Sequence, residues 1–561
     1  MKSAKILFLI LIVLFGSQWA TKAQKASDDI IFKAMNDEMN RSLTRLKFDT
    51  YKPPFFMSYY LSDSKTMYVR ASLGSIVQSY ENPNRTNSLR LMIGDYSLND
   101  ENFAGGNSSY FSGGSLPVPI EDDYNAIRQS FWSMTDVVYK SSIETYAQKL
   151  TALKQQNRTD TVKLDDYLRV PPVQILVNSV PITNDKSKWE TKAKELSALF
   201  KNCGDIASSS IQIGFTQSSF YMTNSEGSRI KCPSAMANLT VIANAQAEDG
   251  DNLRDQLSYS APTLEQLPST EKIKQDIEQL IDRISRMRKS PLVSNSYSGL
   301  VIFEGDAAAE LFRQRLFNFN GLFAQREPIY AVDRYGRGGS NGFESKINQR
   351  ILSANVTIKE TPRLKSFNNI PLVGAYEVDA EGVVPKDELL LVDKGILKTL
   401  LSDRVPTPEV RQSNGHLRFS LSSANTNKAP GVINIAYNKG VTYDTLVNRV
   451  KQQTIENGQE YFYLITKMET GRFNPLIIYR VSAKTGEQQL IRSAQITDFS
   501  NTALKHIVFG TPEQIVYNTR SGDIPVSYIV PRAIVFDDIN IEKEKGTNPK
   551  LPVVPNPVAT K

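Results

Sequence analysis

Histidine and cysteine, which supply most nitrogen and sulfur ligands of protein-bound zinc, are scarce in this chain. Its 561 residues include two histidines, His416 and His506, and two cysteines, Cys203 and Cys232. The histidines lie far apart, and neither has a second histidine at the spacing of a helical zinc motif. We interpret His416, which follows a glycine in a turn, as a structural side chain, with a ligand role as the alternative. We expect His506 to pack on the core at a helix end.

The two cysteines are too few for a disulfide framework. In an oxidising compartment Cys203 and Cys232 could form one disulfide, and two isolated thiols are the alternative. The sequence leaves both open.

Motifs of nucleophilic catalysis and phosphate binding are also missing. No Gly-x-Ser-x-Gly segment, typical of hydrolase nucleophiles, occurs. Residues 269–272, "STEK", match Ser-x-x-Lys, but they precede a helical pattern and indicate an N-cap. The glycine-rich segment 334–345 lacks the apolar strand and the Gly-Lys-Ser/Thr of a phosphate cradle, so we interpret it as a flexible basic loop.

Charge of one sign is not in large excess. The chain has 66 Lys and Arg against 59 Asp and Glu, a formal net charge of +7. Residues 1–23 hold three lysines and no acid, so the remainder carries 66 − 3 − 59 = +4. No block of basic residues accompanies this small excess, and nucleic-acid binding therefore gains no support.

The one long apolar run, Ile6–Phe15, lies near the N-terminus. Lysines precede it and Thr21-Lys22-Ala23 follows, which is the layout of a signal peptide over residues 1–23. The run is too short to span a bilayer comfortably, and an uncleaved anchor is the alternative. We expect an exported protein, periplasmic or secreted, with no transmembrane segment in the mature chain.

The length exceeds what one hydrophobic core usually serves. We predict an α+β protein with an N-terminal α/β domain over 24–115 and a central α/β domain over 116–290. A large, mainly antiparallel β-rich domain is expected over 291–542, and a Pro-rich extended tail over 543–561.

Apolar spacing predicts helices that begin after Asp28-Asp29, span Asp123–Lys154 and span Thr270–Lys289. Strands are expected at 55–61 and 66–74, joined by a hairpin turn at 62–65. A second hairpin is expected within 208–232, around the turn at 224–227.

Two acidic segments could carry chemistry. In "VIFEGDAAAELF" (301–312) a strand runs into a helix at Glu304, a geometry in which hydrolases often place reactive groups. In "YEVDAEG" (376–382) Asp379 and Glu381 precede a glycine. A turn with solvated acids is the ordinary interpretation of the second segment, and a functional role is the alternative.

Taken in order, "GLVIFEGDAAAELF", "GAYEVDAEGVVPKDELLLVDKGILKTLLSDR" and "SNGHLRF" resemble the C-terminal half of the TldD/PmbA (TldE) family. "ALKHIVFG" and the final "KLPVVPNP" extend the likeness. The resemblance implies a metallopeptidase relative. In the catalytic type, two histidines of a His-Glu-x-x-x-His motif and a later cysteine bind zinc, and small or unfolded peptides are cleaved in a closed oligomeric chamber. The related PmbA/TldE subunit lacks these ligands and pairs with the catalytic one.

When the family's His-Glu-x-x-x-His motif is aligned with this sequence, its two histidines correspond to Phe303 and Ala308. Its glutamate corresponds to Glu304. The segment "TPEQIVYNTRSG" (511–522), where the third ligand should lie, contains no cysteine. The resemblance thus implies a protein without the zinc cofactor, in which Glu304 is a vestigial general base. We expect Phe303 to fill the core, and Glu304 and Asp306 to complement the positive end of the following helix.

These patterns favour a non-catalytic partner subunit or a peptide-binding protein. It would form a homo-oligomer, or a hetero-oligomer with a zinc-containing family member. The enzyme alternative is an active metallopeptidase with a non-standard metal site, in which Asp379, Glu381, His416 or Glu304 converge in a cleft. A third class is a free-standing envelope protein that neither cleaves peptides nor has a family partner.

Overall fold

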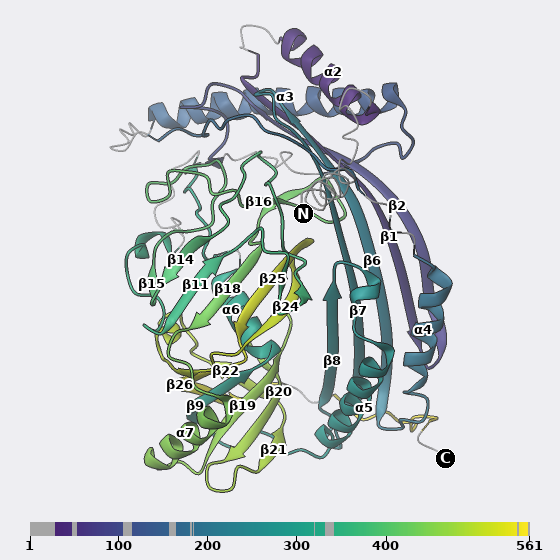
Figure 1. The fold of residues 1–561 in the computed structure, drawn as a ribbon, viewed down its shortest axis with the longest axis vertical. Coiled ribbons are helices and arrows are strands. Elements are labelled where there is room, and N and C mark those ends of the chain that lie inside the picture. Colours follow the sequence, from purple (N-terminus) through teal and green to yellow (C-terminus); the bar gives the residue numbers. More distant parts are fainter. Residues whose placement is uncertain are drawn as a thin grey trace, which may run out of the picture.

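The computed structural model describes residues 29–47, 53–104, 115–155, 164–179, 182, 184–318, 320–330, 342–546 and 549–558. The predicted signal peptide and most of the basic loop 334–345 lie outside the described residues. A long curved sheet forms one side of the molecule, and a domain built from two further sheets lies beside its concave side (Figure 1). The predicted α+β class is confirmed.

The curved sheet is built from five long strands and two short ones. They are β1 (Phe56–Ser72), β2 (Ser75–Met92), β6 (Ile206–Asn224), β7 (Arg229–Gln246), β8 (Asn252–Ala261), β4 (Leu116–Pro117) and β5 (Gln174–Leu176). The order is β4-β2-β1-β6-β7-β5, and β8 also pairs with β7. Strands from both predicted ranges, 24–115 and 116–290, therefore belong to one sheet.

The predicted hairpin turn at 62–65 is wrong, because β1 continues through it. Ser62 lies opposite Thr86 of β2 and opposite Phe220 of β6, so this segment is paired on both sides. Asp63 accepts a hydrogen bond from Arg85 at 2.8 Å, which satisfies a side chain that otherwise favours turns. The chain reverses later, at Leu73-Gly74, where both residues have positive φ.

Four helices pack on the curved sheet. They are α2 (Ile30–Arg45), α3 (Tyr124–Gln155), α4 (Lys186–Ala198) and α5 (Thr270–Met287). The predictions for α2, α3 and α5 are confirmed, including the N-cap at Ser269, whose hydroxyl accepts from the Lys272 N–H at 3.2 Å. Each buried Ile or Leu on such a face stabilises the fold by roughly 1.5–3 kcal/mol.

Side chains along β1 point alternately to the two faces of the curved sheet, and each face contacts a different part of the protein. Met57 and Tyr59 pack under α2 and α3, and the Tyr59 hydroxyl lies 2.7 Å from that of Thr135 on α3. Tyr60 points to the other face and packs in a cluster with Val378 of the C-terminal domain. Because side chains alternate along a strand, one strand serves both contacts.

The C-terminal domain contains two large sheets. The first has the order β15-β14-β11-β18-β25-β24, and the second β21-β20-β19-β9-β26-β22, with β23 paired to β26. The strands of the first are β11 (Val356–Glu360), β14 (Leu389–Asp393), β15 (Ile396–Leu397), β18 (Val432–Tyr437), β24 (Gln514–Ser521) and β25 (Ile524–Pro531). Those of the second are β9 (Tyr297–Glu304), β19 (Tyr461–Met468), β20 (Pro475–Ser482), β21 (Gln488–Ile491), β22 (Ala494–Thr497), β23 (Ile507–Gly510) and β26 (Ala533–Lys543).

Short elements complete the chain. The two-stranded ladders join β3 (Phe103–Ala104) to β10 (Ile329–Tyr330), β12 (Ser366–Phe367) to β13 (Ile370–Pro371), and β16 (Leu417–Phe419) to β17 (Thr426–Lys428). Single 3₁₀ turns span Leu264–Gln266, Glu344–Lys346 and Ala503–Lys505.

Helices α6 (Asp306–Leu316) and α7 (Tyr443–Glu456) cover opposite faces of β9. Val301 and Phe303 of β9 belong to the large core cluster that includes α6. Ile302 points the other way and packs with Leu446 of α7. None of the helices in the described part of the chain has the length and apolar character needed to cross a membrane.

The two cysteines are free thiols in the structure. Cys203 follows α4, and Cys232 lies on β7, where it packs in the cluster around Tyr60. Burial, with a smaller effect of Glu377, raises the pKa of the Cys232 thiol to about 12. This thiol therefore stays protonated and unreactive near neutral pH.

We expect two free thiols per chain in protein purified without reductant. Titration with a chromogenic disulfide reagent in denaturant should give both. In the folded protein Cys232 should react far more slowly, because its thiolate form is scarce. Fewer than one thiol per denatured chain would show that the two sulfurs form a disulfide.

Candidate functional site

Glu304 lies where the central strand β9 turns into α6. β9 pairs in parallel with β19 and antiparallel with β26. Gly305 has φ +62° and forms the N-cap of α6, and its N–H donates to the Arg532 carbonyl at 2.8 Å. A left-handed conformation favours glycine at this position. The predicted strand-to-helix turn is thus present.

Phe303 and Ala308, the positions that match the family's histidines, are both fully buried. The Phe303 ring packs edge-on against Phe536, with ring centroids 5.6 Å apart. Neither side chain has a nitrogen, oxygen or sulfur atom that could bind an ion. The residues at these positions therefore do not fit zinc, and Phe303 fills the core as predicted.

The Glu304 carboxylate is held by two neighbours. The Tyr443 hydroxyl donates to Oε2 at 2.9 Å, and the Arg532 guanidinium lies 3.4 Å from Oε1. Arg532 also stacks over the Tyr443 ring at 4.5 Å. Burial and this carboxylate raise the pKa of Tyr443. Glu304 thus connects β9 to α7. Of the two acids expected to complement the positive end of α6, only Asp306 lies in its first turn.

Asp379 and Glu381 do not form a solvated turn, because their exposed fractions are 0% and 2%. Asp379 Oδ1 accepts from the N–H groups of Glu381 at 2.9 Å and Val383 at 2.8 Å. Oδ2 accepts from the Leu417 N–H at 3.3 Å. Burial raises the pKa of Asp379, and these backbone donors oppose the shift. The carboxylate closes the turn and joins it to β16.

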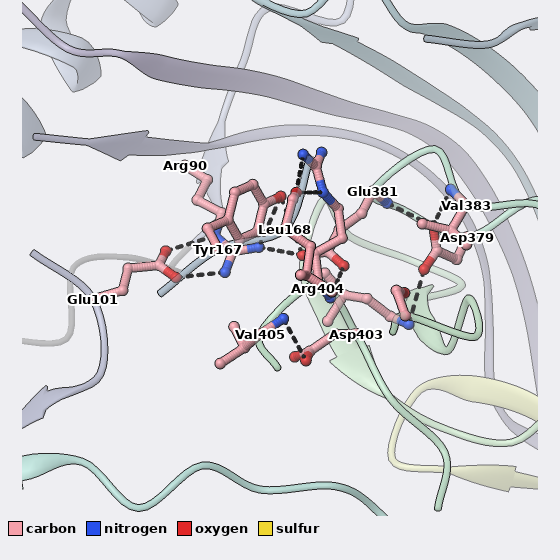
Figure 2. A network of polar contacts seen from close by, with 12 residues as sticks. Arg90, Glu101, Tyr167, Leu168, Asp379, Glu381, Val383, Asp403, Arg404 and Val405 are labelled. Atoms are coloured by element: carbon pink, nitrogen blue, oxygen red, sulfur yellow. Dashed lines mark hydrogen bonds and ion pairs between the residues drawn. The ribbon is translucent and has the colours of Figure 1, made fainter. Parts of the chain in front are cut away.

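Glu381 is the centre of a buried network of charges (Figure 2). Its Oε1 accepts from Arg90 and, at 3.3 Å, from the Tyr167 hydroxyl, and its Oε2 accepts from the Arg404 N–H at 2.7 Å. Burial raises the pKa of Glu381, whereas Arg90 and Arg404 lower it. The two guanidinium groups favour the ionised carboxylate.

The outer partners of this network extend it across the molecule. Arg90, on β2, also pairs with Glu101. Arg404 donates to Glu226 at 2.7 Å, in the β6–β7 turn, and to the Leu168 carbonyl at 2.7 Å. Segments of the curved sheet and of the C-terminal domain therefore meet through charged groups that little water reaches.

His416 is fully buried next to this region. Its Nδ1 lies 2.8 Å from the Asn414 side-chain oxygen, and its Nε2 lies 3.8 Å from Glu360. Glu360 itself accepts from the N–H groups of Gly431 and Val432. This environment agrees with the structural interpretation of His416.

The predicted cleft residues are only partly brought together. Asp379, Glu381 and His416 lie in neighbouring buried segments, joined through the bond from Leu417 to Asp379. Among the contacts of the described residues, none links them to Glu304. Arg90, Tyr167 and Arg404 were missed by sequence reasoning, because no local pattern marks residues that meet only in the fold.

Removing the Glu381 carboxylate should destabilise the protein strongly. We expect Glu381→Ala to lower the free energy of unfolding by about 3–5 kcal/mol, since Arg90 loses a buried counter-ion. Glu388→Ala is the matched control, because Glu388 and Lys359 form an exposed pair at 2.9 Å. That change should cost at most about 1 kcal/mol. Equal losses for both variants in guanidinium unfolding would contradict a special role for Glu381.

A family model matches the C-terminal part of the chain, and solved structures resemble most of its length. Residues 297–543 match the model of the PmbA/TldA metallopeptidase C-terminal domain. No curated protein matches the chain in sequence.

Solved structures share its fold. TldE from Thermococcus kodakarensis is similar with a TM-score of 0.56 and 13% identity, over 91% of this chain and 99% of that one. A protein from Thermotoga maritima, described as a candidate modulator of a DNA gyrase, has a TM-score of 0.56 and 12% identity, over 91% of this chain and 100% of that one. A similarly described protein from Bacteroides thetaiotaomicron has a TM-score of 0.56 and 13% identity, over 93% of this chain and 99% of its own.

At such low identity the likeness shows the fold alone. The sequence match assigns residues 297–543 to the C-terminal domain of the PmbA/TldA metallopeptidases.

Proposed function

We propose that this chain is an exported TldD/PmbA-family protein that does not cleave peptides by itself and acts as a partner subunit or peptide-binding protein. The observation that carries the proposal is the chemistry at positions 303 and 308. Both side chains are apolar and fully buried, where the catalytic type would need imidazole ligands.

The state of Glu304 supports the same proposal. A general base in a zinc peptidase acts on water that the metal has acidified. Here the carboxylate is hydrogen-bonded to Tyr443 and paired with Arg532. It has a structural partner on each oxygen, so it is not poised to accept a proton from water.

A partner role is supported by the family itself. The resemblance implies that PmbA/TldE subunits lack the metal ligands and pair with a catalytic subunit. TldE from Thermococcus kodakarensis shares the fold of this chain over most of its length. The apolar run and flanking lysines in residues 1–23 support export.

Peptide binding is supported by the edge strand β21. Among the described strands, β21 pairs with β20 alone. Its first two residues, Gln488 and Gln489, are exposed. An extended peptide can add to such an edge through main-chain hydrogen bonds. The alternative metal site at Asp379, Glu381 and His416 gains no comparable support, because these side chains are too deeply buried to reach a peptide.

A cleavage assay tests the non-catalytic part of the proposal. The purified mature chain should not cleave fluorescently labelled unfolded casein, with or without added zinc. Cleavage that a chelator abolishes would overturn the proposal. Glu304→Gln is the matched control, because any background cleavage should be unchanged by it, whereas a metal-dependent enzyme that uses Glu304 would lose its activity.

Binding assays test the two remaining roles. Fluorescence anisotropy with the same casein should show saturable binding if the chain is a peptide-binding protein. Co-expression with an exported family member that has an intact His-Glu-x-x-x-His motif should give a co-eluting complex if it is a partner subunit. Failure of both would favour the free-standing envelope protein instead.

A further inference from the structure

A β-bulge in β26 gathers two carboxylates at the surface of the C-terminal domain. Pairing of β26 with β9 runs regularly from Ala533 to Phe536 and resumes at Ile539. Asp537 and Asp538 are the unpaired residues between, and Asp538 has φ +54°. Consecutive side chains of a regular strand point to opposite faces, but the bulge brings both carboxylates to one place.

The exposed histidine of the chain, His506, lies beside this bulge. His506 was predicted to pack on the core, but 52% of its side chain is exposed. It directly precedes β23, whose Ile507 lies opposite Phe536 of β26. The Asp537 N–H donates to the His506 carbonyl at 3.2 Å, which fixes the two segments against each other.

We propose that His506, Asp537 and Asp538 bind a divalent transition-metal ion. One ligand atom from each side chain lies within 4.8 Å of the others, and in the described part of the chain no other such group of three occurs. His506 Nδ1 and Asp537 Oδ1 are 3.4 Å apart. Two donors that each lie about 2.1 Å from one tetrahedral zinc ion are separated by about 3.4 Å.

The electrostatics of the cluster favour a cation. Asp537 Oδ1 is a buried atom, and the His506 imidazole 3.4 Å away offers it an opposite charge only when the imidazole is protonated. A divalent ion would neutralise both carboxylates. One imidazole and two carboxylates suit zinc or manganese better than a soft, thiolate-seeking ion.

This site differs from the positions that match the family's zinc ligands. Ala533 lies opposite Glu304 in the β26–β9 pair, and Asp537 follows four residues later, about 13 Å along the strand. Three protein ligands at an exposed position leave coordination sites for water or a further ligand. The ligands lie next to β23 and within β26, and these two strands pair with each other. The inference is independent of the proposed partner or peptide-binding role.

Isothermal titration of the full mature chain with zinc chloride, after removal of metal by EDTA, tests the site. We expect one equivalent to bind, and His506→Ala and Asp538→Asn each to weaken binding at least about tenfold. Asparagine tolerates the left-handed backbone at position 538, so the second variant keeps the bulge. Asp498→Asn, at an exposed carboxylate outside the cluster, should bind zinc like the native chain.

Circular dichroism of the variants verifies that each is folded. Native-like binding by both His506→Ala and Asp538→Asn would overturn the proposal, as would the absence of saturable zinc binding to the native chain. Equal weakening by Asp498→Asn would show that general negative charge, and not this cluster, attracts the ion.

Discussion

One buried carboxylate, Glu381, joins the curved sheet to the C-terminal domain through charged groups. Moving an ion from water into a protein interior costs several kcal/mol, and Glu381 regains this only through Arg90, Tyr167 and the Arg404 N–H. These partners come from different segments, so the network is satisfied only when the curved sheet and the C-terminal domain meet in one arrangement.

Apolar contacts lie beside this charge network where the curved sheet meets the C-terminal domain. Tyr60 of β1 packs with Val378, which immediately precedes the Asp379 turn. The turn then presents Glu381 to Arg90 from the neighbouring strand β2. The hydrogen bonds from Glu381 and Val383 to Asp379 fix the position of this turn. A change in the turn would therefore disturb the apolar contact and the charge network together.

The sequence predicted those elements whose signal is local. The steps of four between Ile31, Met35 and Met39 repeat one helical face, and α2 is found there. The hairpin turn predicted at 62–65 is wrong because the hydrogen-bond partners of this polar segment, such as Arg85, are distant in the chain. Pairing on both sides overrides a turn propensity that acts only locally. Asp379 and Glu381 were misjudged for the same reason, since burial of an acid depends on partners that only the fold supplies.

For the candidate sites too, the sequence predicts the chemical groups that are present but not their surroundings in the fold. Residue identity alone showed that Phe303 and Ala308 have no metal-binding atom, and the fold adds that both are sealed in the core. The environment of His506 was not predictable, because a bulge reverses the side-chain alternation of Asp537 and Asp538. An alternating strand pattern places these two residues on opposite faces. In this chain nitrogen and oxygen donors therefore gather at a bulged surface strand, whereas apolar side chains fill the positions at the strand-to-helix turn.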